Sequence, residues 1–204
     1  MIKNQILVYD DIVPEKLQDE IEQVLLGPDF PWYMSCHKDE KGNFQTSDYS
    51  QGKKFEHNKN VQDIGQLVHT FMRINENNLT VRSPYFNFIL SVLELTVSKH
   101  NLKNVLVKRI KSNMKPSSSL LNEDSFGIPH KDYDDEHFVL LYYVNDSDGD
   151  TVIFDNEKDL NIIKSVTPKK GRILLFDGKF YHAAGNPISS NYRAVVNYDF
   201  TADE

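Results

Sequence analysis

The sequence contains a single cysteine, Cys36, and no long apolar run. One cysteine excludes a disulfide within the chain, which is compatible with a reducing compartment. No apolar stretch approaches the roughly 20 residues that a membrane-spanning helix requires. The first residues, Met1 to Asn4, lack the charged and apolar regions of a secretory signal. We therefore expect a cytoplasmic protein that does not insert into a membrane.

Basic residues are also in short supply. Lys and Arg number 23 against 30 Asp and Glu, which gives a formal net charge of −7. An acidic chain receives no general electrostatic attraction to the phosphates of DNA or RNA, so no nucleic-acid partner is expected. Lysine and arginine do cluster at residues 103–115 and 164–172. These clusters fit either a local basic patch or the solvated edges of strands and loops.

The chain does contain enough apolar material for a core. Hydrophobic residues make up 39% of the sequence, with 12 Phe and 10 Tyr, and charged residues make up 26%, close to the average for soluble domains. A length of 204 residues suits one domain. No internal repeat or low-complexity tract divides the chain, so we predict a single domain over residues 1–204.

The first half of the chain shows mainly helical spacing of its apolar residues. A short strand is expected at residues 6–9, and residues 29–60 fit either weak strands or a functional loop. Apolar residues recur at helical spacing in three segments, residues 14–26, 61–72 and 86–100. The pattern predicts a helical support region over residues 1–103.

The second half is different in character. Runs rich in Val, Ile, Phe and Tyr alternate with turn clusters of Gly, Asp, Asn and Pro. Six strands are predicted, at residues 104–110, 137–144, 151–154, 161–167, 172–176 and 192–200. Short strands at regular spacing indicate a sandwich or a jelly roll. The fold class that we predict is mainly β, with supporting helices packed on one sheet.

Three side chains form a candidate metal site. His130 and Asp132 stand two residues apart, and in a strand residues i and i+2 point to the same side. His182 follows the predicted strand at residues 172–176 and offers a distant second imidazole. Two histidines and one carboxylate on one face of an ion form the triad that holds non-haem iron(II) and leaves positions open for other ligands.

A candidate anion-binding residue follows the second histidine. Arg193 lies eleven residues after His182, which allows a turn and a return along the neighbouring strand. A planar guanidinium can bind a carboxylate through two parallel hydrogen bonds. Taken alone, each element is weak, because either histidine could equally be an ordinary interior or surface residue. The order and the spacing of the whole set carry the hypothesis.

The set resembles the 2-oxoglutarate/iron(II)-dependent dioxygenase superfamily, specifically its prolyl-4-hydroxylase-like branch. The resemblance covers roughly residues 104–200. The family pattern is present here as HKD, YYVN, GDTVIF, VTPKKGRILLF, His182 and Arg193. Two positions depart from it: the usual Gly-Gly turn is Gly149-Asp150, and the usual tyrosine before HxD is absent from residues 107–111. The second departure bears on a prolyl substrate more than on the chemistry.

The resemblance implies a double-stranded β-helix over residues 104–200 and a defined set of cofactors. Iron(II) would be held by His130, Asp132 and His182, with O₂ and 2-oxoglutarate as cosubstrates and ascorbate as an optional addition. Arg193 would pair with the C5 carboxylate of 2-oxoglutarate, and Tyr143 would add a hydrogen bond to it. The implied reaction hydroxylates an unactivated C–H of a peptidyl or free amino-acid side chain, releasing succinate and CO₂.

Some alternatives stay open at this point. Asn197 shares a strand face with Arg193, so it points either into the barrel near the cosubstrate or simply serves as a hydrogen-bonded interior residue. The substrate could be a peptide, a protein or a small molecule. A non-catalytic β-helix protein that binds a metal or a carboxylate ligand is the alternative function. Arg193 favours the oxygenase over this alternative, because a bare metal-binding barrel needs no cation at that position.

Overall fold

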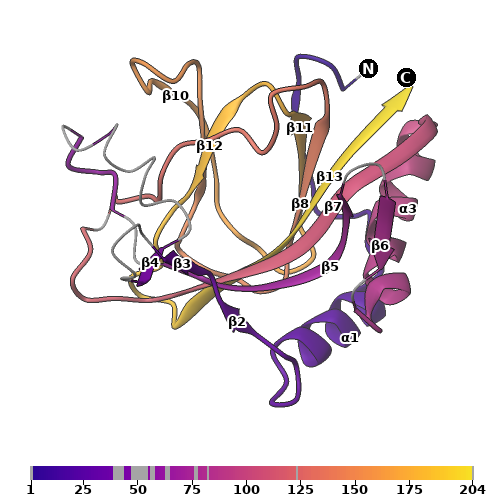
Figure 1. Ribbon diagram of the computed structural model, residues 1–204, viewed down its shortest axis with the longest axis horizontal. Coiled ribbons are helices and arrows are strands. Elements are labelled where there is room, and N and C mark those ends of the chain that lie inside the picture. Colours follow the sequence, from indigo (N-terminus) through magenta and orange to yellow (C-terminus); the bar gives the residue numbers. More distant parts are fainter. Residues whose placement is uncertain are drawn as a thin grey trace.

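A computed structural model describes residues 2–38, 44–46, 55, 58–62, 65–75, 78–81, 83–122 and 124–203. A large antiparallel sheet dominates it (Figure 1). In spatial order, its strands are β1 (Ile6–Tyr9), β11 (Ile173–Asp177), β8 (Phe138–Tyr143), β13 (Tyr192–Asp203), β7 (Lys103–Pro116), β5 (Leu67–Asn75) and β2 (Tyr33–Met34), with β6 (Asn78–Val81) paired to β5. Because β1 pairs with β11 and β5 with β7, strands from both halves of the chain share this sheet.

A smaller sheet packs against one face of the large one. Its strands are β10 (Ile162–Val166), β9 (Thr151–Phe154) and β12 (Tyr181–Ala184). The side chains between the sheets alternate along each strand, as period two requires: Val139, Leu141 and Tyr143 of β8 meet Ile153 of β9 and Phe176 of β11. A separate two-stranded pair, β3 (Cys36–Lys38) with β4 (Phe44–Thr46), completes the described strands.

The opposite face of the large sheet is covered by helices. Among the described residues these helices are α1 (Glu15–Leu25) and α3 (Phe86–His100), and both lie along this face in Figure 1. The alternate residues of the same strands, such as Leu140 and Tyr142, pack against them together with Ile21. The Tyr198 hydroxyl donates a hydrogen bond to the carbonyl of Ile89 at 2.8 Å, which ties β13 to α3. None of the helices that the structure describes is long and apolar enough to cross a membrane.

The predicted helix at residues 61–72 is wrong. Within that segment, residues 63 and 64 lie outside the described residues, and Leu67 begins strand β5, which pairs with β7. A β-bulge between Thr70 and Met72 explains the error, because it lets Phe71 and Met72 both be buried. Two adjacent buried residues break the alternation of a strand and imitate the spacing of a helix.

The prediction that residues 1–103 form a helical support region is therefore only partly correct, because the region also contains strands. That half contains the two helices, in the places where the spacing predicts them, but it also contributes strands β1, β2, β5 and β6 to the large sheet. Short strands occupy part of residues 29–60, while residues 39–43, 47–54 and 56–57 lie outside the described residues. In the second half all six predicted strands are present, and β9 has the predicted bounds.

Candidate metal centre and anion pocket

Strands β7 and β13 carry polar residues on the face that points away from the helices. Direct cross-strand neighbours include Arg109 with Asp199, Lys111 with Asn197, and Lys115 with Arg193. The residues between them, such as Val196 and Tyr198, point into the apolar core under the helices. This alternation produces a polar interior surface. It lines a cavity of about 330 Å³ that the two sheets share.

The two candidate histidines lie side by side at this cavity. His130 and His182 form an isolated antiparallel bridge, with N–H···O distances of 3.0 and 2.9 Å. Their rings are 4.7 Å apart, centroid to centroid. His182 follows strand β11 as predicted, but it lies in a further strand that was not predicted, β12, where it pairs with Ile153. The backbone thus brings together two imidazoles that are far apart in the sequence.

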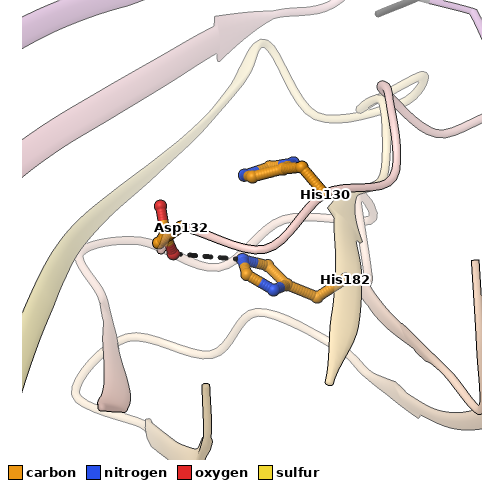
Figure 2. Close-up of side chains that lie close together, drawn as sticks. All are labelled: His130, Asp132 and His182. Carbon is orange, nitrogen blue, oxygen red and sulfur yellow. Dashed lines mark ion pairs between the residues drawn. The ribbon is translucent and has the colours of Figure 1, made fainter. Parts of the chain in front are cut away.

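Asp132 reaches the same point from a bend. The sequence argument placed His130 and Asp132 in one strand, and this is wrong, because Asp132 lies in a bend outside the strands. The expected convergence nevertheless occurs, as Figure 2 shows for the three side chains. One ligand atom from each of the three residues lies within 4.8 Å of the others, and His182 Nε2 is 3.4 Å from Asp132 Oδ2.

Hydrogen bonds fix which nitrogen of each histidine faces the cavity. Nδ1 of His130 bonds to the carbonyl of Ile128 at 2.9 Å, and Nδ1 of His182 bonds to the carbonyl of Phe180 at 3.3 Å. A carbonyl oxygen only accepts, so the proton must sit on Nδ1 in both rings. Nε2 then carries the lone pair, which is the tautomer that a metal ligand needs.

The carboxylate between them is held in its ionised form. Asp132 is buried, and its Oδ2 also accepts a hydrogen bond from Asn197 Nδ2 at 3.2 Å. Burial opposes ionisation, but a hydrogen bond from His182 when its Nε2 is protonated, together with the charge of Arg109, outweighs burial and holds the pKa of Asp132 well below its usual range. A divalent cation would take the place of the Nε2 proton, and a buried carboxylate with two imidazoles is a suitable set of donors for it.

At the other end of the cavity lies a buried guanidinium with neutral partners. Arg193 is 2% exposed. Its Nε donates to the carbonyl of Gly149 at 2.7 Å, and its Nη2 donates to Thr151 Oγ1 at 2.6 Å. Among the residues that the structure describes, no carboxylate forms an ion pair with it. Burial lowers the pKa of Arg193, despite the opposing influence of Tyr143 and Asp150.

Tyr143 belongs to the same end. Its hydroxyl donates to Thr151 Oγ1 at 2.6 Å, and its ring lies 5.7 Å from the guanidinium carbon of Arg193. Burial raises the pKa of Tyr143 to about 12, so the phenol stays protonated at neutral pH. Thr151 thus joins the two residues that the sequence singled out for the cosubstrate carboxylate.

The structure also shows residues that the sequence argument missed. Thr151 is the third residue of the GDTVIF segment, and only its neighbours suggested a role. Arg109 lies in the stretch where the family tyrosine is absent, and that departure was the available signal. Lys111 and Asn113 line the cavity from the same strand. Asn197 lines the cavity, and its amide donates a hydrogen bond to Asp132, so it is both a cavity residue and a hydrogen-bonded interior residue.

Comparison with known proteins supports the fold. No family model and no curated protein matches the sequence. A 2OG-Fe(II) oxygenase family oxidoreductase from Burkholderia pseudomallei matches the structure with a TM-score of 0.66 and 13% identity, over 96% of this chain and 84% of that one. A Trichoplax adhaerens prolyl hydroxylase, in complex with a hypoxia inducible factor oxygen degradation domain peptide fragment, matches with a TM-score of 0.58 and 14% identity, over 97% and 84%.

A third similar structure is a Pseudomonas putida prolyl-4-hydroxylase, with a TM-score of 0.52 and 12% identity, over 98% of this chain and 94% of that one. At identities this low, the structural similarity establishes the fold alone, and the chemistry has to be inferred from the residues of the site. The resemblance inferred from the sequence motifs is confirmed at that level: this chain has the fold of the 2-oxoglutarate/Fe(II) oxygenases and prolyl hydroxylases.

Proposed function

We propose that this chain is an iron(II)- and 2-oxoglutarate-dependent dioxygenase that hydroxylates an unactivated C–H bond. One observation carries the proposal: a His-Asp-His cluster and a buried guanidinium without a described carboxylate partner line the same cavity. A bare metal site needs no such cation, and a structural arginine would normally have a counter-ion at this depth.

The three ligand residues fit iron(II). Two imidazole nitrogens and one carboxylate oxygen are a donor set that iron(II) accepts while keeping positions open for other ligands. His130 and His182 already present their lone-pair nitrogens, and Asp132 is already ionised. When bound, iron(II) would supply the oxidising chemistry with O₂ as 2-oxoglutarate is converted to succinate and CO₂.

The protein's own contribution at the other end is to hold the cosubstrate by its C5 carboxylate. Arg193 supplies the charge, and its burial excludes the water that would compete for the carboxylate. Thr151 supplies direction. Its oxygen accepts from both Arg193 and Tyr143, which occupies both lone pairs and leaves its own O–H to donate. A carboxylate next to Arg193 is the acceptor that this hydroxyl lacks among the described residues.

The substrate class that we propose is a peptidyl or free amino-acid side chain. The support is the fold shared with prolyl hydroxylases, of which the Trichoplax adhaerens structure holds a peptide fragment. Residues 107–111 of this chain lack the usual tyrosine, and Arg109 there contacts Asp132. We therefore assign a prolyl-hydroxylase-like reaction without restricting the substrate to proline.

The test is uncoupled decarboxylation of 2-oxoglutarate with iron(II) and ascorbate. We expect turnover in the wild type and in Lys164→Ala, a matched control on the exposed face of β10, and none in His182→Ala or Arg193→Ala. Anaerobic binding of 2-oxoglutarate without any turnover in air would favour the non-catalytic alternative. If the wild-type protein showed no binding and no turnover of 2-oxoglutarate, the proposal would be refuted.

A further inference from the structure

The carboxylate of Asp132 needs an external support, because it lies in a bend and no strand fixes its side chain. Its two oxygens have different partners. Oδ1 accepts a hydrogen bond from Arg109 Nη2, whereas Oδ2 faces Asn197 Nδ2 at 3.2 Å and His182 Nε2 at 3.4 Å. The oxygen on the metal side is therefore already distinguished from the oxygen on the far side.

Arg109 is itself held rigidly. Its Nε and its Nη2 both lie 2.8 Å from Oδ2 of Asp199, the residue directly opposite on β13. The ring of Tyr133, which follows Asp132 in the chain, lies 5.5 Å from the guanidinium carbon. A guanidinium bound on one side by a fully buried carboxylate and packed against an aromatic ring presents its remaining donor in a fixed direction.

We propose that Arg109, fixed by Asp199, is a positioning residue that turns Oδ2 of Asp132 toward the metal and keeps Oδ1 out of its coordination shell. The inference rests on the proposed function, because it requires that the His-Asp-His cluster bind a metal. A carboxylate that binds through one oxygen leaves more positions open than one that binds through two. Those open positions are what a bidentate cosubstrate and O₂ together require.

The experiment uses Co(II) as a spectroscopic probe of the full-length protein. Co(II) affinity and the ligand-field absorption spectrum are measured for wild type, Arg109→Lys, and the double variant Arg109→Gln/Asp199→Asn. The double variant avoids leaving the fully buried Asp199 as a carboxylate without its Arg109 partner. Lys108→Gln is the matched control, because Lys108 is the adjacent residue on β7 and pairs with the exposed Asp135 outside the cavity.

We expect the control to equal wild type. The double variant should bind Co(II) about 10- to 100-fold more weakly, the range typical for loss of an outer-shell partner of a metal ligand. Its spectrum should shift toward higher coordination, since both oxygens of Asp132 become available. Arg109→Lys should recover part of the affinity but not the wild-type spectrum, because an ammonium cannot hold both carboxylates in a fork.

The outcomes separate this inference from the proposed function. Wild-type protein that binds no Co(II) refutes both. Wild-type protein that binds Co(II), with the spectrum and affinity of Arg109→Lys and of the folded double variant within about twofold of wild type, refutes only the role of Arg109. If the double variant does not fold, Arg109→Lys decides alone: an unchanged spectrum contradicts the proposal, and a shifted one supports it.

Discussion

The two ends of the cavity handle buried charge in opposite ways. At the metal end, the carboxyl groups of Asp132 and Asp199 share the guanidinium of Arg109. If both carboxyl groups were ionised, their negative charge would exceed the positive charge of Arg109. Burial and then the charge of Asp132 raise the pKa of Asp199 to about 8, so near neutral pH a proton offsets the excess. At the anion end, Arg193 has only neutral partners among the described residues. With Asp199 protonated, the charges of Asp132 and Arg109 balance at the metal end, whereas the positive charge of Arg193 has no described carboxylate partner at the anion end.

This difference distinguishes charges that are paired within the protein from a charge that a bound ligand would pair. A network of paired charges holds its side chains in position. A buried charge with neutral neighbours lowers the stability of the fold until an anion binds beside it. Removing a residue from the first end should damage binding of the metal. Removing Arg193 from the second end should damage binding of 2-oxoglutarate while sparing the ligand-free fold.

The largest effect is expected for His182→Ala. This change removes the side chain of a proposed ligand, while the backbone bridge between residues 130 and 182 keeps both of its hydrogen-bonding groups. Loss of an outer-shell partner costs about 10- to 100-fold in metal affinity, so loss of a ligand should exceed about 100-fold. Titration with Mn(II), followed by electron paramagnetic resonance of the free ion, measures it. Affinity within about tenfold of wild type would remove His182 from the metal site.

The second prediction breaks the anion end alone. Arg193→Met should weaken 2-oxoglutarate binding by about 2–5 kcal/mol, since the carboxylate loses a buried charged partner. Without ligand, the free energy of unfolding of this variant should lie within about 1 kcal/mol of the wild-type value, because an apolar side chain replaces a charge that has no described carboxylate partner. Anaerobic calorimetry with Mn(II) present and urea unfolding without ligand measure the two quantities.

A different pattern would overturn this reading of Arg193. If the ligand-free variant lost about 3–5 kcal/mol of stability, the guanidinium would behave as half of a buried ion pair. Arg172→Met is the matched control, because Arg172 pairs with Asp10 at the surface and does not line the cavity. That control should leave 2-oxoglutarate affinity unchanged.

The third prediction sharpens the role of the shared hydroxyl. Thr151→Val keeps the shape of the side chain but removes the oxygen that accepts from Arg193 and Tyr143. We expect 2-oxoglutarate affinity to fall by about 1–3 kcal/mol, because buried donors lose their acceptor. Mn(II) affinity should stay within about twofold, since the metal ligands keep their partners. An equal loss in both affinities would show that the two ends are not independent.

The smallest effect concerns the turn that carries Gly149, whose carbonyl accepts from Arg193. Asp148 in this turn accepts hydrogen bonds from the backbone amides of Ser189 and Ser190. Burial opposes its ionisation, but these amides outweigh burial and lower the pKa of Asp148 to about 2. Because the folded pKa lies below the unfolded value of about 3.9, the stabilisation is present above pH 4 and is lost as the pH falls toward 2.

Asp148→Asn should therefore be less stable than wild type at neutral pH, by a small margin because the side chain is exposed. The margin should shrink below about pH 4 and disappear near pH 2. Urea midpoints of both proteins, measured between pH 7 and pH 2, provide the test. A margin that does not change across this range would mean that the charge of Asp148 plays no part.

Local spacing predicted much of the second half of the chain. Strand β9 begins and ends at the predicted residues, and the chain order of His130, Asp132, His182 and Arg193 was enough to place them at one cavity. These features depend on nearby sequence and on motif order. Strand β5 escaped prediction because its bulge at Thr70 conceals the alternation of buried residues.

The supporting contacts could not be read from the sequence. Arg109 faces Asp199 only because β7 and β13 pair in one particular register, and a shift by one residue would turn Arg109 away from the cavity. Thr151 reaches Arg193 from the other sheet, through packing that no local pattern encodes. The proposed metal ligands and Arg193 were therefore predictable, whereas Arg109 and Thr151, which contact them, were not.

The most direct test of the account is the affinity of the wild-type protein for 2-oxoglutarate, measured without oxygen in the presence and absence of Mn(II). If one ligand spans both ends of the cavity, Mn(II) should tighten 2-oxoglutarate binding by more than about tenfold. By linkage, 2-oxoglutarate should then tighten Mn(II) binding by the same factor. Equal 2-oxoglutarate affinity with and without the metal would contradict the account, because the guanidinium and the metal cluster would then not act on a common ligand.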